Sequence, residues 1–158
     1  MKKIILFLAI FITFQQLSAQ ENQFKKNAIY GSIGNAGLYF TATAYYERII
    51  KQEMWEKNIS SFVNLGYGGQ AYWGGEGSYF LARYGIITGV KTHHLEGSLG
   101  ILYGFDGYQS LRRVYRLFEN TTPSGSIGWR RQKFDKNFLI RAGLGFPETI
   151  YFGIGVAF

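Results

Sequence analysis

From residue 20 onward, apolar side chains alternate with small or polar ones in runs separated by short polar stretches. No window of about 11 residues in this part keeps a helical period, whereas a period of two recurs throughout. Because successive side chains of a strand point to opposite faces, the pattern predicts an all-β chain. Eight strands are expected, at residues 28–34, 39–50, 59–72, 78–88, 93–105, 124–131, 138–146 and 150–158.

An even number of antiparallel strands can close into an up-and-down barrel. The strand that carries Phe158 would then pair with the strand that carries Ile29, and no edge would stay open. The connections expected at one end include tight turns within TGVKTH and KFDKNF, and the other end has the longest loop, residues 106–123. Short turns at one end and longer loops at the other are typical of transmembrane barrels.

The two faces of the fifth predicted strand differ in polarity. One face carries Leu95, Leu99, Ile101, Tyr103 and Phe105, and the opposite face carries His94, Glu96 and Ser98. An apolar wall around a polar or small interior indicates a membrane barrel, because a soluble barrel that holds an apolar ligand has the reverse polarity. We therefore expect an eight-stranded antiparallel transmembrane β-barrel, monomeric, with lipid on its outer face. A soluble periplasmic ligand-binding barrel is the alternative.

The first 19 residues have the layout of a cleaved secretory signal peptide. Lys2 and Lys3 precede an apolar run of 11 residues, 4–14, and small residues follow at Ser18 and Ala19. The apolar run is shorter than the roughly 20 residues that a membrane-spanning helix needs. The expected domains are the signal peptide, 1–19, and the barrel, 20–158.

Composition narrows the possible partners. The chain has no cysteine, which excludes disulfides and thiolate metal sites. Residues 20–158 hold 15 basic and 10 acidic side chains, a mild positive bias without the dense basic run expected of a nucleic-acid-binding protein. His93 and His94 are adjacent and face opposite sides of a strand, so they cannot easily bind one metal ion together, and no metal site is expected. No other cofactor is expected.

The last eight residues, YFGIGVAF, resemble the C-terminal signal of the outer-membrane β-barrels of Gram-negative bacteria. In that family a polar or tyrosyl residue, a glycine, an apolar residue and a final aromatic residue guide insertion, and Tyr151, Gly153, Val156 and Phe158 match them. The whole mature chain resembles the small barrels of the OmpX and OmpA-transmembrane kind, without the periplasmic peptidoglycan-binding domain of OmpA. The resemblance implies the outer membrane as location. It implies outer-membrane lipids, lipopolysaccharide and the barrel assembly machinery as partners.

The stretch HHLEGS contains the residue types of an activated hydroxyl: His94, Glu96 and Ser98 share one face of one strand. Some eight-stranded outer-membrane barrels are lipid A deacylases that use such residues, with His and Ser two positions apart and facing the lipid. Here they are four positions apart, roughly 13 Å along a strand, and face the lumen. We therefore expect polar lumen filling and no enzyme, with a lipid-modifying enzyme as the alternative.

Turn geometry predicts which lumen charges meet. If Val90 and Lys91 form the turn, Arg83 lies opposite Ser98 and diagonal to Glu96. A turn at residues 135–136 places Arg130 opposite Arg141, and these like charges need Glu47 or Glu96 nearby. The expected lumen network comprises Glu47, Arg83, His94, Glu96, Ser98, Arg130 and Arg141. Such a lumen would be a plug rather than a pore.

The longest loop contains Arg112, Arg113 and Arg116 within SLRRVYRLFEN. These arginines form either a solvated cluster or a contact with the phosphates of lipopolysaccharide. The function expected from the sequence is that of a non-enzymatic envelope protein, acting in surface interaction or envelope integrity.

Overall fold

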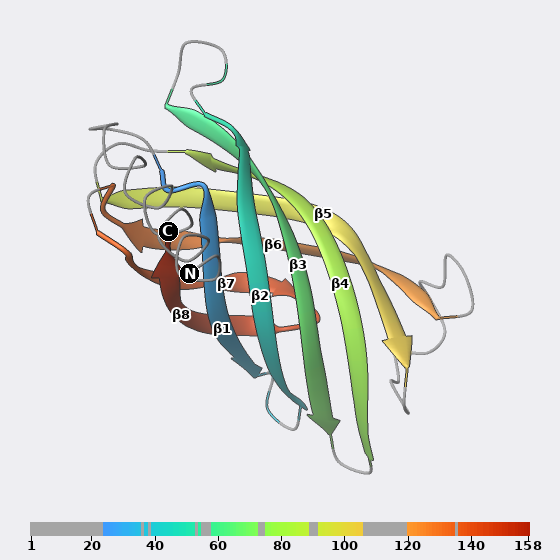
Figure 1. Cartoon of the computed structure of the whole chain (residues 1–158). Coiled ribbons are helices and arrows are strands. Elements are labelled where there is room, and N and C mark those ends of the chain that lie inside the picture. The colour runs from blue at the N-terminus through green and yellow to red at the C-terminus, as the bar shows by residue number, and fades with distance from the viewer. Residues whose placement is uncertain are drawn as a thin grey trace, which may run out of the picture.

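The computed structural model describes residues 24–35, 37, 39–52, 54, 58–72, 75–88, 92–105, 120–134 and 136–158. These residues form the eight antiparallel strands of an all-β barrel (Figure 1). The strands are β1 (Asn27–Asn35), β2 (Tyr39–Lys51), β3 (Ile59–Tyr72), β4 (Gly75–Thr88), β5 (His93–Phe105), β6 (Thr121–Gln132), β7 (Phe138–Phe146) and β8 (Thr149–Ala157).

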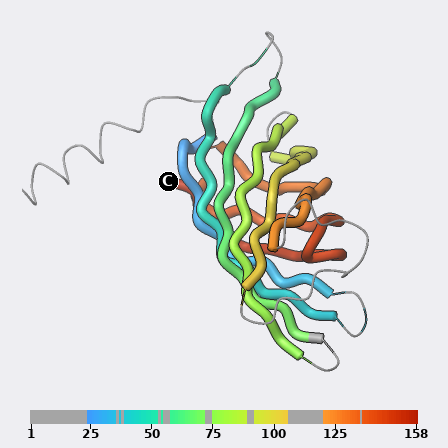
Figure 2. Tube along the Cα trace, turned by 90° about the vertical axis from the view of Figure 1, so that its right-hand side faces the viewer, coloured from blue at the N-terminus to red at the C-terminus, as the bar shows by residue number. Residues whose placement is uncertain are grey.

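The barrel is closed in simple up-and-down order. Each strand pairs with the next along the chain, and β1 pairs with β8 from Ala28↔Ala157 to Asn35↔Ile150. Figure 2 shows the strands following one another around the wall from blue to red. The predicted fold class is therefore confirmed, and the two strands expected to close the barrel do so.

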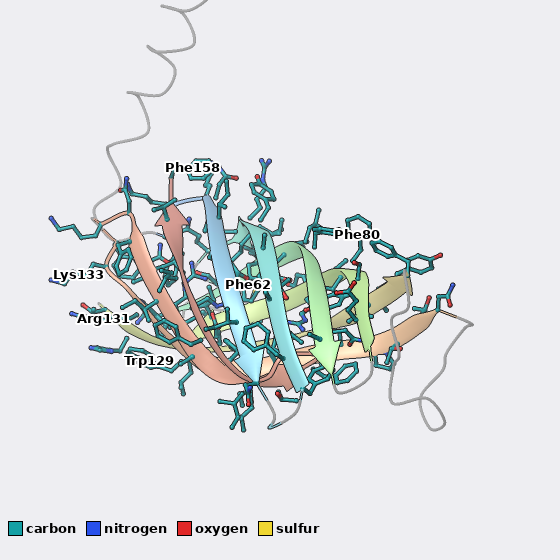
Figure 3. All side chains as sticks on the ribbon, turned by 90° about the horizontal axis from the view of Figure 1, so that it is seen from below. Phe62, Phe80, Trp129, Arg131, Lys133 and Phe158 are labelled. Carbon is teal, nitrogen blue, oxygen red and sulfur yellow. The ribbon has the colours of Figure 1, made fainter. Side chains whose placement is uncertain are left out.

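Side chains alternate between the wall and the lumen along most of each strand, and the alternation is interrupted where the register of β2 and β3 shifts between Ile49 and Lys51. On β5, Leu95 is 66% exposed and Leu99 is 78% exposed, whereas His94 and Glu96, the two neighbours of Leu95 in the sequence, are buried. Large apolar side chains project outward from every strand, as Figure 3 shows for Phe80 and Trp129. The polarity is thus inverted relative to a soluble domain, whose buried positions are mostly apolar.

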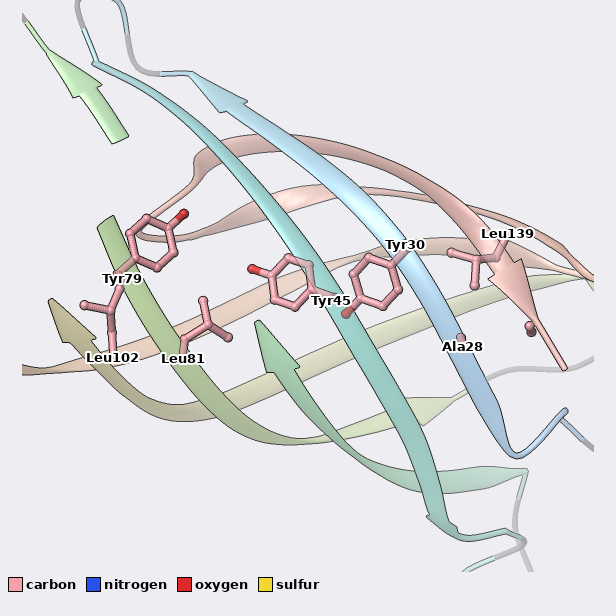
Figure 4. Close-up of a cluster of buried hydrophobic side chains, with 8 residues drawn as sticks. Ala28, Tyr30, Tyr45, Tyr79, Leu81, Leu102 and Leu139 are labelled. Carbon is pink, nitrogen blue, oxygen red and sulfur yellow. The ribbon is translucent and has the colours of Figure 1, made fainter. Parts of the chain in front are cut away.

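The lumen is filled by aromatic and aliphatic side chains as well as by charges. Figure 4 shows Tyr30, Tyr45 and Tyr79 inside the wall, and the rings of Tyr30 and Tyr45 are stacked with centroids 4.8 Å apart. Glycine makes room for these rings. A Cβ on Gly66 would lie 2.7 Å from the ring of Tyr45. Small residues on the inner face therefore let bulky ones from neighbouring strands meet across the lumen.

Three groups of sequence predictions fall outside the described residues. They are the signal peptide, 1–19, the turn residues Val90 and Lys91, and the loop arginines Arg112, Arg113 and Arg116. Within the part of the chain that is described, no helix is long and apolar enough to cross a bilayer.

Candidate functional site: the charged lumen

Two arginines and two glutamates from four strands meet inside the lumen. Arg130 Nη1 on β6 lies 2.5 Å from Glu47 Oε1 on β2, and Arg141 Nη2 on β7 lies 2.6 Å from Glu96 Oε1 on β5. Longer contacts complete the ring: Arg130 reaches Glu96 Oε2 at 3.9 Å, and Arg141 reaches Glu47 Oε2 at 3.8 Å. All four residues are at most 4% exposed. Each buried charge therefore has two partners of opposite sign, as a desolvated charge requires.

The register between β6 and β7 is the predicted one. Arg130 pairs with Arg141, the two like charges that the turn at residues 135–136 was expected to place opposite one another. Their guanidinium groups are shared between Glu47 and Glu96, the carboxylates named as their counter-charges. The sequence offered Glu47 or Glu96 as the counter-charge, and in the structure both carboxylates contact both arginines.

Aromatic hydroxyls and rings surround the quartet. The guanidinium of Arg141 lies 4.3 Å from the ring centroid of Tyr30, and Tyr151 Oη donates to Glu96 Oε1 at 3.2 Å. Asn64 Nδ2 donates to Tyr30 Oη at 3.2 Å, so β3 also contributes to the network. These contacts fix the rotamers of the charged side chains, because ring faces and hydroxyls hold the guanidinium and carboxylate groups from several sides.

The predicted partner of Arg83 is wrong. Arg83 pairs with Gly100 rather than with Ser98, and Glu96 pairs with Ile87, because the pairing of β4 with β5 is displaced by two residues. A displacement by an even number of residues does not change which face a side chain is on, so Arg83, Glu96 and Ser98 still face the lumen. However, the partner of Arg83 on β5 is now four residues from Glu96 instead of two. The ion pair of Glu96 is therefore made with Arg141, and Arg83 has a different counter-charge.

That counter-charge is Glu148, in the connection between β7 and β8. Arg83 Nη2 donates to Glu148 Oε2 at 2.8 Å and Nη1 donates to Oε1 at 3.2 Å, a bidentate pair. Tyr45 Oη also donates to Glu148 Oε1. Arg83 Nη2 and Ser124 Oγ donate to the carbonyl oxygen of Phe146 at 2.6 and 2.8 Å, so the connection is folded into the lumen and held there.

The charge state of Glu148 follows from these contacts. Burial disfavours the ionised carboxyl and would by itself raise the pKa of Glu148. The attraction and hydrogen bonds of Arg83, with the hydrogen bond from Tyr45, outweigh burial and lower the pKa below its usual value of 4.5. Glu148 is therefore ionised at neutral pH.

His94, Glu96 and Ser98 lie on the lumen face of β5, and each has its own partner. His94 Nε2 is 3.0 Å from the carbonyl oxygen of Gln132, and Ser98 Oγ is 2.8 Å from Ser126 Oγ. Glu96 binds Arg141, as described above. A nucleophile and its base must lie within hydrogen-bond reach of one another, and these contacts instead direct the three side chains to separate neighbours on β6 and β7.

His93 and His94 lie on opposite sides of the wall. His93 points outward and stacks on Trp129, with ring centroids 5.6 Å apart, while His94 packs edge-on against Phe24 inside, with centroids 4.7 Å apart. No group of three or more His, Cys, Asp or Glu residues with metal-binding geometry occurs among the described residues.

Side chains close the lumen toward both ends. At the end that carries the termini, Phe24 enters the barrel and packs with Ile49, Phe62 and Ile87, and Gln52 Nε2 donates to its carbonyl oxygen at 2.8 Å. Toward the other end, the Glu148 connection lies across the lumen. The cavity between Arg83 and Arg141 measures about 10 Å³, close to the minimum for one water molecule. The arrangement is a plug.

The residues of the expected C-terminal signal divide between the two faces of β8. Tyr151 and Gly153 face inward, and Val156 and Phe158 are about half exposed on the outside. The main chain of Phe158 exchanges two hydrogen bonds with Asn27, of 2.8 and 3.0 Å. The last residue thus extends the seam between β8 and β1.

Sequence reasoning missed Glu148 and Phe24. Alternation assigns no face to a residue in a connection, and for this reason Glu148 was not predicted to lie in the lumen. A count of the predicted lumen charges, three arginines against two glutamates, would have indicated a missing carboxylate. Phe24 precedes the first strand, so no periodicity included it.

Comparisons with known proteins add no name to this geometry. No protein-family model matches the chain, and neither a curated protein nor a solved structure is found to be similar to it.

Proposed function

We propose that this protein is a non-enzymatic, integral β-barrel of the Gram-negative outer membrane, of the OmpX-like kind, that acts at the cell envelope in surface interaction or envelope integrity. The observation that carries the proposal is the inverted polarity of the barrel. Its wall is covered with exposed aromatic and aliphatic side chains, and its charged residues in strand centres face inward in neutralised groups. Water would be a poor solvent for such a wall, whereas hydrocarbon suits both the wall and a fully paired backbone.

The filled lumen supports a role other than transport. Arg130, Arg141, Glu47 and Glu96 are buried in it, with Phe24 on the side of the termini and Glu148 on the other side. Solute passage would require breaking buried ion pairs, which is costly when one partner is left behind. We therefore place the activity of the protein in its outer surface and its connections, which is where binding functions commonly lie on a rigid scaffold. The proposed partners are outer-membrane lipids, lipopolysaccharide and the barrel assembly machinery, and the proposed oligomeric state is a monomer.

Fractionation of Gram-negative cells that express the full chain tests the location. We expect the protein in the outer-membrane fraction, extractable only with detergent, and a shifted band on SDS gels for the unboiled sample, because a closed barrel resists unfolding by detergent. Recovery in the soluble periplasmic fraction without detergent would contradict the proposal and favour a soluble ligand-binding barrel.

Mass spectrometry of lipid A from cells that express the protein tests the absence of catalysis. We expect the mass spectrum of lipid A to be identical in cells that express the wild type, His94→Ala or no protein. A change in lipid A acylation that depends on His94 would favour the lipid-modifying alternative.

A further inference from the structure

Among the described residues, the charges on the outside of the barrel gather at one end. The lumen holds three arginines and three glutamates, so it contributes no net charge. The exposed end that carries both termini has a basic rim, which we define as Lys25, Lys26, Arg48, Lys51, Arg131, Lys133 and Lys136. Figure 3 shows Arg131 and Lys133 pointing away from the wall at this end. Among the described residues, the opposite rim has one charged side chain, Glu76. The basic rim therefore attracts anions where the apolar wall ends.

Arg48 is the cation of this rim that stands directly below a hollow in the wall. It faces outward on β2, where it pairs with Asn27 on β1 and Val63 on β3. Two residues farther along β2 on the same face, roughly 6.6 Å away, lies Tyr46. The ion pairs between described residues all lie inside the lumen, and none of them includes Arg48. Its guanidinium is thus available to an external anion.

The hollow measures about 600 Å³, within the range of about 300–1,000 Å³ typical of small-molecule sites. Strand pairing places the outward-facing part of its lining in two parallel rows on the outer wall, and the inward-facing Tyr45, Gly66 and Leu81 lie beneath them. The lower row is Ile29, Tyr46, Leu65, Ala82 and Ile101, and the upper row is Ala44, Tyr67, Phe80 and Tyr103. The rows cross from β1 to β5, which corresponds to about 19 Å of wall at the spacing of neighbouring strands.

Two alanines create the hollow. Ala44 and Ala82 occupy outward positions in a wall whose other members in these rows are large. A second hollow, of about 660 Å³, adjoins the first at Ala44 and Tyr67 and extends over β1 toward β8. In it a Cβ on Gly31 would meet nothing within 4 Å, so packing inside the barrel does not require a glycine there. The glycine at position 31 therefore leaves space on the outside of the wall that packing within the barrel does not explain.

We propose that these hollows and Arg48 form a binding site for one anionic phospholipid, with the phosphate on Arg48 and the acyl chains in the hollows. The inference rests on the proposed membrane location. A guanidinium donates two hydrogen bonds to phosphate in a matching geometry, and Lys51 adds positive charge on the same strand. Two adjoining apolar hollows fit the two chains of a diacyl lipid.

The shape of the site favours a lipid over a second copy of the barrel. The hollows lie between ridges of aromatic side chains, such as Tyr67 and Phe80, whose ring centroids are 5.0 Å apart. The wall of another barrel is convex and would rest on these ridges. A thin, flexible chain can enter between them and make the close contacts on which dispersion energy depends.

Native mass spectrometry tests the site. The folded barrel in mild detergent is mixed with equal amounts of phosphatidylglycerol and phosphatidylethanolamine, and retained lipids are counted. We expect one retained phosphatidylglycerol in the wild type. Arg48→Gln should reduce the preference for phosphatidylglycerol about fivefold, since one basic residue near a lipid surface contributes roughly 1 kcal/mol. The double variant Ala44→Leu, Ala82→Leu should reduce retention of both lipids, because it fills the first hollow.

Matched controls lie elsewhere on the wall. Arg131→Gln removes another exposed rim cation, on β6, and Ala142→Leu fills an outward alanine position on β7 that lines neither hollow. Both should behave as the wild type. Every variant is first checked for the gel shift of the closed barrel, and Ala82→Val replaces the double variant if the latter does not fold.

Three results would overturn the site. They are unchanged lipid selection in Arg48→Gln, an equal loss in Arg131→Gln, or barrel dimers without retained lipid. Failure of the wild type to associate with bilayers at all would instead overturn the proposed membrane location, so the two failures are distinguishable.

Discussion

Arg83 on β4 and Glu148 in the connection between β7 and β8 form a bidentate ion pair inside the lumen, with donor–acceptor distances of 2.8 and 3.2 Å. The side chains are 2% and 3% exposed. The pair ties a connection at one end of the barrel to the middle of the opposite wall. Because both groups are desolvated, the loss of either one leaves a buried charge without its counter-charge.

The first prediction is a double-mutant cycle on this pair. Glu148→Gln should destabilise the barrel by about 3–5 kcal/mol, and adding Arg83→Met should recover part of that loss. The measurement is urea unfolding of the barrel in detergent micelles. The cycle of Arg83→Met with Glu96→Gln should be nearly additive, because Glu96 binds Arg141 and Arg130. Coupling in the second cycle and additivity in the first would contradict the observed pairing.

The second prediction concerns acid. The pKa of Glu148 is lower in the folded barrel than its usual value of 4.5, so its ionised form stabilises the fold. This stabilisation is complete above about pH 4.5 and is lost as the pH falls through the lower folded-state pKa. The protection factors of the amides at residues 146–150, which compare their exchange rates with those of the unstructured chain at the same pH, should therefore fall at low pH in the wild type. In Glu148→Gln the protection factors should be low already at pH 7 and should change less with pH. An identical pH profile in both proteins would show that another group controls the connection.

The third prediction separates two roles of Phe158. Its main chain bonds to Asn27, and its ring lies on the outer wall. Phe158→Ala keeps the backbone hydrogen bonds and removes the ring, whereas deletion of Phe158 removes both. If the assembly machinery reads the aromatic ring, both variants should lower the amount of folded protein in the outer membrane, with export unchanged. A deficit only in the deletion variant would mean that the seam, rather than the ring, is what matters.

The fourth prediction concerns the loop arginines, which lie outside the described residues. If Arg112, Arg113 and Arg116 contact lipopolysaccharide phosphates, changing all three to Ser should lower the amount of co-purifying lipopolysaccharide. Each contact can contribute about 1–3 kcal/mol as a charge-assisted hydrogen bond. The thermal stabilisation by added lipopolysaccharide should fall in parallel. Equal retention and equal stabilisation would identify a solvated loop cluster.

Alternation predicted every strand because the outer face of each strand carries large apolar side chains and the inner face is mixed, with most of the small and charged residues. A clear difference between two faces specifies register and face strongly. Differences occur where that signal is weak. β4 begins at Gly75 rather than at residue 78, since Gly75 and Gly77 have no side chain to report a face. β6 includes Pro123 as well, because β6 pairs with β7 only from Gly125 and so has one neighbour at this proline.

Parity, the alternation of side chains between the two faces of a strand, predicted which charged residues of the candidate site face the lumen, but not all of their contacts. Parity placed Arg83, Arg130, Arg141, Glu47 and Glu96 in one lumen, and the turn between β6 and β7 gave the correct register. The pairing of β4 with β5 differs by two residues, which changes partners without changing faces. Contacts that depend on how a connection folds back, such as that of Glu148, follow from tertiary packing and have no local pattern.

The pairing of β1 with β8 has a consequence for how the chain reaches its final form. The two strands lie at opposite ends of the described sequence, so the pairing that closes the barrel is also the strand contact with the longest intervening chain. Until this pairing forms, β1 and the most recently added strand at the other edge of the sheet each present a row of unpaired backbone amides and carbonyls, which can pair with other chains. A prematurely terminated product that lacks β8 would keep both edges permanently. Such fragments should therefore associate with one another, and quality control that recognises exposed strand edges would remove them.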